Sequence, residues 1–98
     1  METYNDIING NTPVLVDFFA EWCSPCKAMK PVLDNLKQSM GDKVRIIKID
    51  VDKNQALAAS HSVQAVPTFI LFLKGKAVWR TSGACSMNTL KETIERYI

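Results

Sequence analysis

The spacing of the apolar residues changes between residues 20 and 23, and this change places a buried strand directly before a helix. Residues 13–20, "PVLVDFFA", are an almost continuous apolar run, which predicts a strand buried on both faces. Asp17 alone interrupts the run. From Cys23 to about Met40 the apolar residues recur at the spacing of one helical face, and they are Met29, Val32, Leu33, Leu36 and Met40.

The rest of the chain continues this alternation of helices and strands. Before the first strand, residues 3–10 predict a short helix with Thr3 as its N-cap and Gly10 as its stop. Pro31 predicts a kink in the helix at 23–40, and Gly41 ends that helix. The remaining elements are a second inner strand at 44–51, a helix at 54–62, a third strand at 67–73, a tight turn at 74–76, a fourth strand at 77–81, and a last helix capped by Ser86 with Met87, Leu90, Ile94 and Tyr97 on its inner face.

This order of elements predicts an α/β fold. Strands separated by helices imply right-handed parallel crossovers. The hairpin at 67–81 then adds an antiparallel edge. We therefore expect a single domain over residues 1–98, with a small central mixed sheet flanked by helices on both faces.

Composition and charge exclude several classes of protein. The 98 residues are 47% hydrophobic, which permits a packed core, and a net charge of +2 with scattered basic residues argues against nucleic-acid binding. No apolar run approaches the roughly 20 residues that span a bilayer. The start, "METYNDIING", lacks the basic and apolar regions of a secretory signal. We expect a cytoplasmic protein without membrane contact, unless an export signal has been trimmed.

Two of the three cysteines, Cys23 and Cys26, form a C-x-x-C motif. A structural staple across so short a loop would add little stability. Tetrahedral zinc takes four ligands, and only Cys85 and His61 remain, neither at the spacing of a zinc site. We therefore expect no metal, and the motif in this strand–helix context indicates redox chemistry.

The position of Cys23 at the start of the predicted helix favours a reactive sulfur. Free N–H groups and the helix dipole at this end stabilise a thiolate, which is the nucleophilic form. Cys26 lies on the same helix face, with Cβ atoms ~5–6 Å apart, so a small adjustment closes a disulfide. Pro25 is tolerated in a first helical turn, where its missing N–H has no cost.

Three stretches of the sequence together resemble the thioredoxin family. They are "VDFFAEWCSPCK", "AVPTF" and "SGACS", and the likeness covers nearly the whole chain. The resemblance implies the thioredoxin fold and a protein-disulfide reductase in which Cys23 attacks the substrate and Cys26 resolves the mixed disulfide. It also implies a redox-active Cys23–Cys26 disulfide with no bound cofactor, electrons from NADPH through a thioredoxin reductase, disulfide-containing substrate proteins, and a monomer.

Asp17 and Lys48 match a buried acid of the family and its partner. The resemblance implies that Asp17 manages the proton of Cys26, with Lys48 beside it in the neighbouring strand. An independent physical reason supports this, because a carboxyl group inside an apolar strand has a raised pKa. The alternative is a partly solvated strand residue without a chemical role.

The resemblance also marks a substrate groove around the cysteines. Pro67 matches the proline that is cis in this family and faces the disulfide, and the backbone of Val66 would pair with an extended substrate segment. Trp22 matches the rim of this groove, and the alternative is that it is a partly buried core tryptophan. Lys27 also matches the family, and the alternative is that it is a solvated helix lysine. Gly83 and Ala84 match the remaining rim of this groove, and Ser24 and Pro25, between the two cysteines, are also expected to contact the substrate.

Three features depart from the commonest pattern of the family. Ser24 stands where that pattern has glycine, and its hydroxyl would lower the pKa of the thiolate and make the disulfide more oxidising. Phe19 replaces a tryptophan and should still pack under the site. The arm before residue 13 is short, so we expect the family's first strand to be missing or short, leaving about four strands.

Two residues lie outside the site that the resemblance marks, and two functions other than disulfide reduction stay open. We expect Cys85 to be a small apolar loop residue, with an exposed regulatory or dimer-forming thiol of lowered pKa as the alternative, and His61 to be a surface helix residue. The other functions are a disulfide oxidase or isomerase of exported proteins, and a non-catalytic binding module with the thioredoxin fold. The chain is too short for an inserted helical domain of the strong-oxidant type. A pure scaffold has no need for the full set Cys23, Cys26, Asp17 and Pro67.

Overall fold

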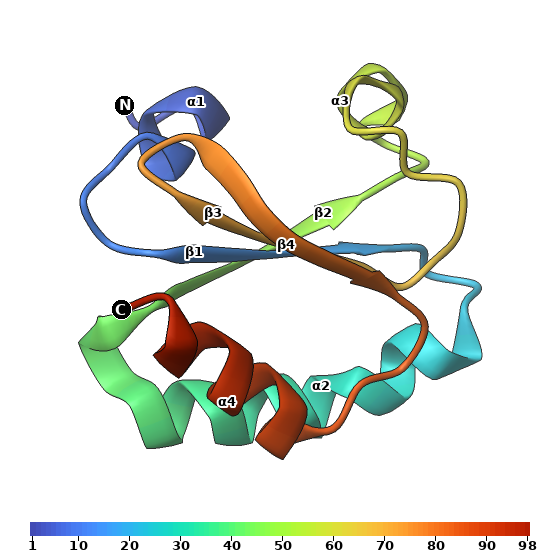
Figure 1. The fold of residues 1–98 in the computed structure, drawn as a ribbon. Helices are drawn as coiled ribbons and strands as arrows, with labels where there is room; N and C mark the ends of the chain where they lie inside the picture. The colour runs from blue at the N-terminus through green and yellow to red at the C-terminus, as the bar shows by residue number, and fades with distance from the viewer.

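The computed structural model describes all residues, 1–98, and its centre is a four-stranded sheet (Figure 1). The strands lie side by side in the order β2-β1-β3-β4. Their bounds are β1 Val14–Phe19, β2 Arg45–Asp50, β3 Thr68–Leu73 and β4 Lys76–Ser82. The number of strands agrees with the expectation of about four.

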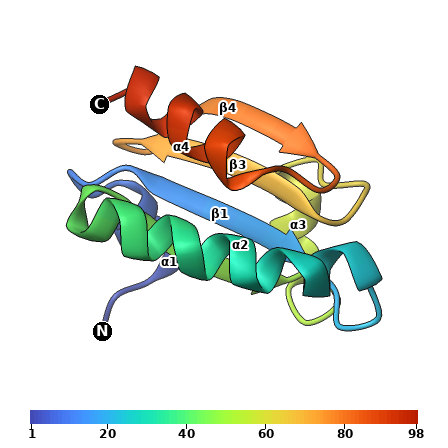
Figure 2. The ribbon, with the colours of Figure 1, turned by 90° about the horizontal axis from the view of Figure 1, so that it is seen from below.

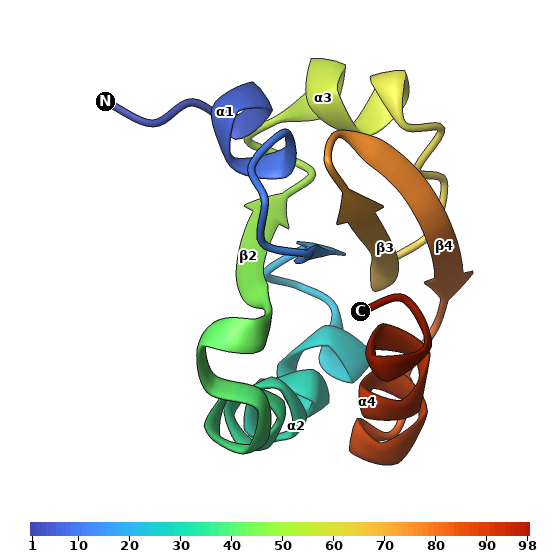
Figure 3. The same cartoon turned by 60° about the vertical axis from the view of Figure 1, so that its left-hand side comes forward.

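Helices cover both faces of the sheet, as the sequence predicts. α2 (Ser24–Met40) and α4 (Met87–Arg96) lie together on one face, and α1 (Tyr4–Ile8) and α3 (Gln55–Ser60) lie on the other (Figures 1, 2 and 3). A short 3-10 helix, Gly41–Lys43, follows α2. None of the helices has the length and apolar character needed to cross a membrane.

Two apolar layers hold the helices to the sheet, because successive side chains of a strand point to opposite faces. The layer under α2 and α4 is formed by Leu15, Phe69 and Leu71 of the sheet with Met29, Leu33, Leu36, Met40, Val44, Leu90 and Ile94. The opposite layer is formed by Ile8 of α1 with Val14, Val16, Phe18, Ile70 and Phe72. β1 is therefore buried on both faces, as predicted for residues 13–20.

β2 lies at an edge of the sheet, so its prediction as an inner strand is wrong. It pairs only with β1, in parallel, with Arg45 opposite Val14. Its isoleucines pack into both apolar layers, Ile46 into one and Ile47 into the other, so its sequence looks like that of an inner strand. The apolar pattern reports what covers the two faces of a strand, and it does not report whether another strand occupies the edge.

β3 runs antiparallel to β1, so the expectation of a second parallel crossover is also wrong. Thr68 at the start of β3 lies opposite Phe18, and Asp50 at the end of β2 lies opposite Phe19. α3 has 6 residues, and a helix of that size is about 9 Å long, whereas a strand of the same size spans about 20 Å. The connection through α3 does not return the chain to the far end of the sheet, so β3 starts where β1 and β2 finish.

Local signals place the helix ends as expected. The side chains of Thr3 and Ser86 each accept a backbone N–H of the helix that follows. Gly41 ends α2 with a φ of 57°. α2 contains Pro31 and remains one helix from Ser24–Met40, so the proline does not interrupt it.

His61 and Tyr97 differ from their predictions. His61 is half-buried at the end of α3, where its ring centroid is 5.4 Å from that of Phe72 and its Nε2 is 3.0 Å from the hydroxyl of Tyr4. Tyr97 follows α4, is 41% exposed, and donates its hydroxyl to the carbonyl of Val78 at 3.1 Å. Both contacts join segments that are distant in the sequence, so residue spacing does not reveal them.

The β3–β4 hairpin turns at Lys74 and Gly75, which both have positive φ, 49° and 84°. Glycine adopts this backbone without steric cost. The N–H of Gly75 donates to the carbonyl of Ile8 at 2.7 Å, which ties the hairpin to the end of α1. A Cβ at Gly75 would collide with the side chain of Asn9.

We predict that Gly75→Ala lowers the free energy of unfolding by about 2 kcal/mol, because a left-handed φ costs an L side chain ~1–2 kcal/mol and Asn9 must also move. Urea unfolding measures the change. Gly83→Ala is the matched control, because its φ of 95° is close to that of Gly75 but a Cβ there meets nothing within 4 Å. Its loss should be about 1 kcal/mol. Equal losses at the two positions would contradict the contact of the hairpin with Asn9.

Candidate functional site

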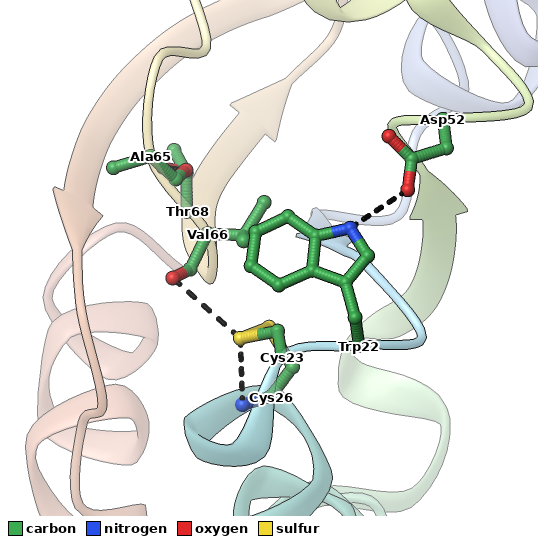
Figure 4. Close-up of a disulfide and its surroundings, with 7 residues drawn as sticks. All are labelled: Trp22, Cys23, Cys26, Asp52, Ala65, Val66 and Thr68. Carbon is green, nitrogen blue, oxygen red and sulfur yellow. Dashed lines mark hydrogen bonds between the residues drawn. A yellow bond between two sulfur atoms is a disulfide. The ribbon is translucent and has the colours of Figure 1, made fainter.

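Cys23 and Cys26 form a disulfide at the start of α2 (Figure 4). β1 ends at Phe19, and the chain enters α2 through Cys23, which is the N-cap residue. The Cα atoms of the two cysteines are 5.2 Å apart. The Sγ atom of Cys23 accepts the backbone N–H of Cys26 at 3.2 Å. The C-x-x-C motif therefore lies where the sequence placed it, between a buried strand and a helix.

The start of α2 favours a negative charge on Cys23 once the disulfide is reduced. Its Sγ occupies the place of a capping oxygen and accepts a backbone N–H at the positive end of the helix dipole. Pro25 in the first turn has no N–H that would need a partner. The exposed fractions, 4% for Cys23 and 8% for Cys26, do not separate the two sulfurs. The position at the helix end distinguishes the two sulfurs, because it stabilises the thiolate of Cys23.

The Val66–Pro67 peptide bond is cis, as the family resemblance implies, and the carbonyl group of Val66 points toward the disulfide (Figure 4). The carbonyl oxygen of Val66 is 3.7 Å from Sγ of Cys23. Pro67 is buried, and its carbonyl accepts the N–H of Gly83 at 2.8 Å. This bond joins the segment before β3 to the segment after β4 and holds the Val66 carbonyl near the sulfur.

The backbone of Val66 has bonding capacity left for another chain. Neither its N–H nor its C=O takes part in a backbone hydrogen bond. Unpaired backbone groups of this kind accept an extended peptide as an added strand. Of the other residues assigned to the groove rim, Ser24, Pro25 and Ala84 are exposed. The effect expected of the Ser24 hydroxyl on the thiolate stays a prediction, because the cysteines are oxidised here.

Trp22 is 71% exposed beside the disulfide, so the alternative of a core tryptophan is wrong. Its indole Nε1 donates to Oδ2 of Asp52 at 3.0 Å (Figure 4). Sequence reasoning missed Asp52, whose only signal was an acidic residue shortly after the end of a strand. A small pocket of about 160 Å³ lies alongside, lined by Trp22, Val51, Val63, Gln64, Ala65 and Val66.

Asp17 lies inside the sheet, 2% exposed, and its Oδ1 atom has no hydrogen-bond partner. Burial raises the pKa of Asp17 to about 6, while the positive charge of Lys48 acts in the opposite direction. Lys48 lies directly opposite Asp17 in the register of β1 and β2. It is exposed and forms no ion pair with Asp17. The carboxyl group is therefore buried without a compensating contact. The alternative of a partly solvated strand residue is wrong.

Asp17, Lys48 and Cys26 line one pocket of about 320 Å³. The sequence pointed to these three residues separately, and the sheet brings them together. Lys27, an exposed residue of α2, lines the same pocket, and this position does not separate a role at the site from that of a solvated helix lysine. Sequence reasoning missed Lys30, which is one helical turn from Lys27 and on the same face of α2.

Phe19 and Cys85 occupy the positions expected of them. Phe19 is half-buried and packs under the site against Ala20, Cys23 and Cys26. Cys85 is half-buried against the apolar layer of α2 and α4, and burial raises the pKa of its thiol. Cys85 thus serves as an apolar residue. No three His, Cys, Asp or Glu side chains are arranged to hold a metal ion.

Comparisons of sequence with known proteins place this arrangement in context. The family model described as Thioredoxin matches residues 1–96. A thioredoxin of Pyropia yezoensis is 38% identical over 93 residues, which are 95% of this chain and 87% of that protein. The chloroplastic thioredoxin Y of Oryza sativa subsp. japonica is 45% identical over 83 residues, or 85% of this chain. The match spans 49% of the rice protein, about half of its length.

Solved structures show the same likeness in three dimensions. A point mutant of a thioredoxin from Halobacterium salinarum has a TM-score of 0.87 and 41% identity, with 95% of this chain and 80% of that chain covered. The oxidised mitochondrial thioredoxin 3 from Saccharomyces cerevisiae has a TM-score of 0.86 and 36% identity, with 95% and 86% covered. At these identities the likeness extends from the fold to the sequence.

We predict that Asp17→Asn raises the free energy of unfolding at pH 7.5 by roughly 3 kcal/mol. Its pKa is about 6 in the folded protein and ordinarily 3.8, and each unit of difference corresponds to ~1.36 kcal/mol. The folded state binds this proton more tightly than the unfolded state, so the wild-type protein loses stability as the pH rises from about 4 to about 6. The amide removes this loss. Below pH ~4 the two proteins should have nearly equal stabilities.

Urea unfolding of both proteins at pH 3.5 and 7.5 checks this prediction. Asp34→Asn is the control, because Asp34 is an exposed carboxylate on α2 paired only with Lys30. Its effect should stay within about 0.5 kcal/mol at both pH values. A gain for Asp17→Asn that is the same at both pH values would show that burial does not raise the pKa of Asp17.

Proposed function

Because this chain belongs to the thioredoxin family, we propose that its physiological reaction is the reduction of protein disulfides by the dithiol of Cys23 and Cys26. The chain has the thioredoxin fold and is a thiol–disulfide oxidoreductase acting on protein disulfides. The observation that carries the function is the Cys23–Cys26 disulfide at the N-terminus of α2, next to the unpaired backbone of Val66.

We assign the first step to Cys23. Its thiolate attacks one sulfur of the substrate disulfide, and the bond between the two substrate sulfurs breaks. The second substrate sulfur leaves as a thiolate and takes up a proton. A mixed disulfide then joins Cys23 to the substrate. The position of Cys23 as the N-cap of α2 supports this role, because the helix end stabilises the attacking anion.

Cys26 completes the exchange in this proposal. Its thiolate attacks Sγ of Cys23, the bond from Cys23 to the substrate breaks, and the substrate sulfur that Cys23 first attacked leaves as a thiolate. The Cys23–Cys26 disulfide forms, and the substrate has gained two electrons from the dithiol. The separation of 5.2 Å between the two Cα atoms supports this step, because a disulfide at this distance needs little backbone movement.

Asp17 is proposed as the acceptor of the proton that Cys26 loses. The two residues line the same pocket, and a pKa of about 6 suits a base that works near neutral pH. Lys48, opposite Asp17 in the sheet, favours the ionised form of the carboxyl group. Both residues act through Cys26 and are not part of the substrate groove.

The substrate is proposed to bind as an extended segment across the disulfide. The N–H and C=O of Val66 would pair with its backbone, in the manner of an added strand. Pro67 holds Val66 in place through its own bond to Gly83. The rest of the contact surface is formed by Trp22, Ser24, Pro25, Gly83 and Ala84.

The disulfide formed in each cycle must be reduced again. We propose NADPH as the electron source, through a thioredoxin reductase, with the protein acting as a monomer on disulfide-containing proteins. Such a cycle belongs in a reducing compartment, for which we propose the cytoplasm. One of the relatives is a chloroplastic protein, so the relatives do not support the cytoplasm. The proposal of the cytoplasm rests only on the need for a reducing compartment.

Reduction of insulin disulfides tests the function. We expect the protein to accelerate the reduction by dithiothreitol and to couple it to NADPH oxidation when a thioredoxin reductase is added. No activity in either assay would refute the proposed reaction. Activity with dithiothreitol alone would refute only the proposed electron donor. Cys85→Ser is the control, and it should retain both activities because Cys85 packs against the apolar layer of α2 and α4 and is not part of the disulfide.

Mixed-disulfide trapping tests the two cysteine roles. Cys26→Ser should accumulate covalent complexes with substrate proteins on non-reducing gels, because Cys23 still attacks and nothing resolves the product. Cys23→Ser is the matched variant and should trap ~tenfold less, since Cys26 lacks the position at the helix end. Equal trapping by the two variants would reverse the assignment.

A further inference from the structure

The pocket beside Cys26 has features that disulfide exchange does not require. Its volume of about 320 Å³ is that of a small-molecule site. It opens between β1, β2 and the first turns of α2, away from Trp22 and Val66, which line a separate pocket. Its apolar wall is formed by Phe19, Ala20 and Cys26. A molecule with an apolar body therefore fits between the strands and the helix.

The rim of this pocket is positively charged. Three lysines line it, and two of them, Lys27 and Lys48, have no ion-pair partner. Lys30 is paired with Asp34 of its own helix at 3.0 Å. The one acidic rim residue, Glu21, is paired with Lys53 outside the pocket at 3.5 Å. Two lysines without an ion-pair partner therefore line the pocket, and their positive charges favour an anion there.

Asp17, one of the residues that line the pocket, has an unsatisfied polar atom. Oδ1 of Asp17 is buried without a hydrogen-bond partner, although the residue is 2% exposed. Buried polar atoms without a partner are rare and destabilising, and each one needs an explanation. In its neutral form Asp17 has an O–H to donate. A ligand with an oxygen acceptor would satisfy it.

We propose that this pocket binds a small carboxylate with an apolar body, whose oxygens accept the O–H of neutral Asp17 and the N–H groups of Lys27 and Lys48. The apolar body lies against Phe19 and Ala20. The arrangement is complementary in both charge and polarity, since the two lysines are exposed and the neutral donor is buried.

Binding of this kind takes up a proton. Asp17 must be neutral to donate, and its pKa is about 6, so above that pH the affinity falls by about tenfold for each pH unit. Several other ionisable groups face Asp17 around the pocket. They are Lys48 of β2, Lys27, Lys30 and Cys26 of α2, and Glu21 of the segment between β1 and α2, and β3 contributes the uncharged Phe69 opposite Asp17.

An occupied pocket has a consequence for disulfide exchange. The ligand holds Asp17 in its neutral form, so the carboxyl group no longer accepts the proton of Cys26. A carboxylate would then slow the resolving step. This consequence rests on the proposed role of Asp17, whereas the binding site itself does not, because binding is measurable on the oxidised protein.

Titration of the oxidised wild-type protein with benzoate tests the site, with benzamide as the neutral probe of the same shape. Backbone amide chemical shifts should change at Asp17, Cys26 and Lys48, and benzamide should bind at least tenfold more weakly. Between pH 7 and 8 the dissociation constant of benzoate should rise about tenfold. Equal binding of the two probes, a flat pH profile, or shifts confined to Trp22 and Val66 would overturn the proposal.

Variants give a second, independent reading. Asp17→Asn keeps a donor in place, so it should bind benzoate with no change between pH 7 and 8. Lys27→Gln and Lys48→Gln should each weaken binding about threefold, in line with exposed ion pairs. Lys43→Gln, outside the pocket, should leave the affinity unchanged. A pH dependence retained in Asp17→Asn would overturn the proposal, and the wild-type profile remains a test if a variant fails to fold.

A free molecule and an acidic side chain of a bound protein offer the same carboxylate. The end-blocked peptide Gly-Gly-Asp-Gly-Gly and its Asn counterpart separate the two sources. Tighter binding of the Asp peptide than of benzoate, lost in the Asn peptide, assigns the pocket to a protein side chain. Tighter binding of benzoate assigns it to a free carboxylate with an apolar body, as proposed, whereas tighter binding of the Asp peptide would overturn the proposed apolar body. Failure of both carboxylates to bind would remove the site, and leave the insulin assay unaffected.

Discussion

The burial of β1 between two layers of helices holds every part of the site in register. Its side chains point alternately into the two apolar layers, so a shift by one residue would turn each of them to the wrong face. β1 leads directly to the start of α2 and its two cysteines. β2 on one side carries Lys48, and β3 on the other side begins next to Pro67. One buried strand therefore positions the sulfur, the carboxyl group and the carbonyl of Val66.

Asp17 is the point at which this strand departs from apolar packing. Its neighbours Val16 and Phe18 are fully buried apolar residues, and Asp17 is buried to nearly the same degree with an unpaired oxygen. Such a group destabilises the fold, so packing does not explain its presence. The proposed transfer of a proton from Cys26, which lines the same pocket, would account for a carboxyl group at this position. The strand thus combines a structural constraint with a chemical one.

Much of the fold and of the site was predictable because the signals are local. The caps of Thr3 and Ser86 act within one helical turn, and the C-x-x-C motif lies within the first turn of α2. Asp52 and His61 were missed for the opposite reason. Their partners, Trp22 and Tyr4, are 30 and 57 residues away in the sequence, and no spacing rule joins such pairs. The pocket was missed in the same way, because three elements contribute its walls.

The sequence by itself determined which segments become helices and strands, which faces are buried, and which sulfur lies at a helix end. These properties depend on side-chain type and spacing, which are written in the chain. Only the tertiary structure decided that β2 is an edge strand and that β3 is antiparallel to β1. It also decided that the carbonyl oxygen of Val66 lies 3.7 Å from Sγ of Cys23. Strands pair through backbone N–H and C=O groups, which are the same in nearly every residue. Their order and direction therefore follow from how the whole chain packs and closes its connections.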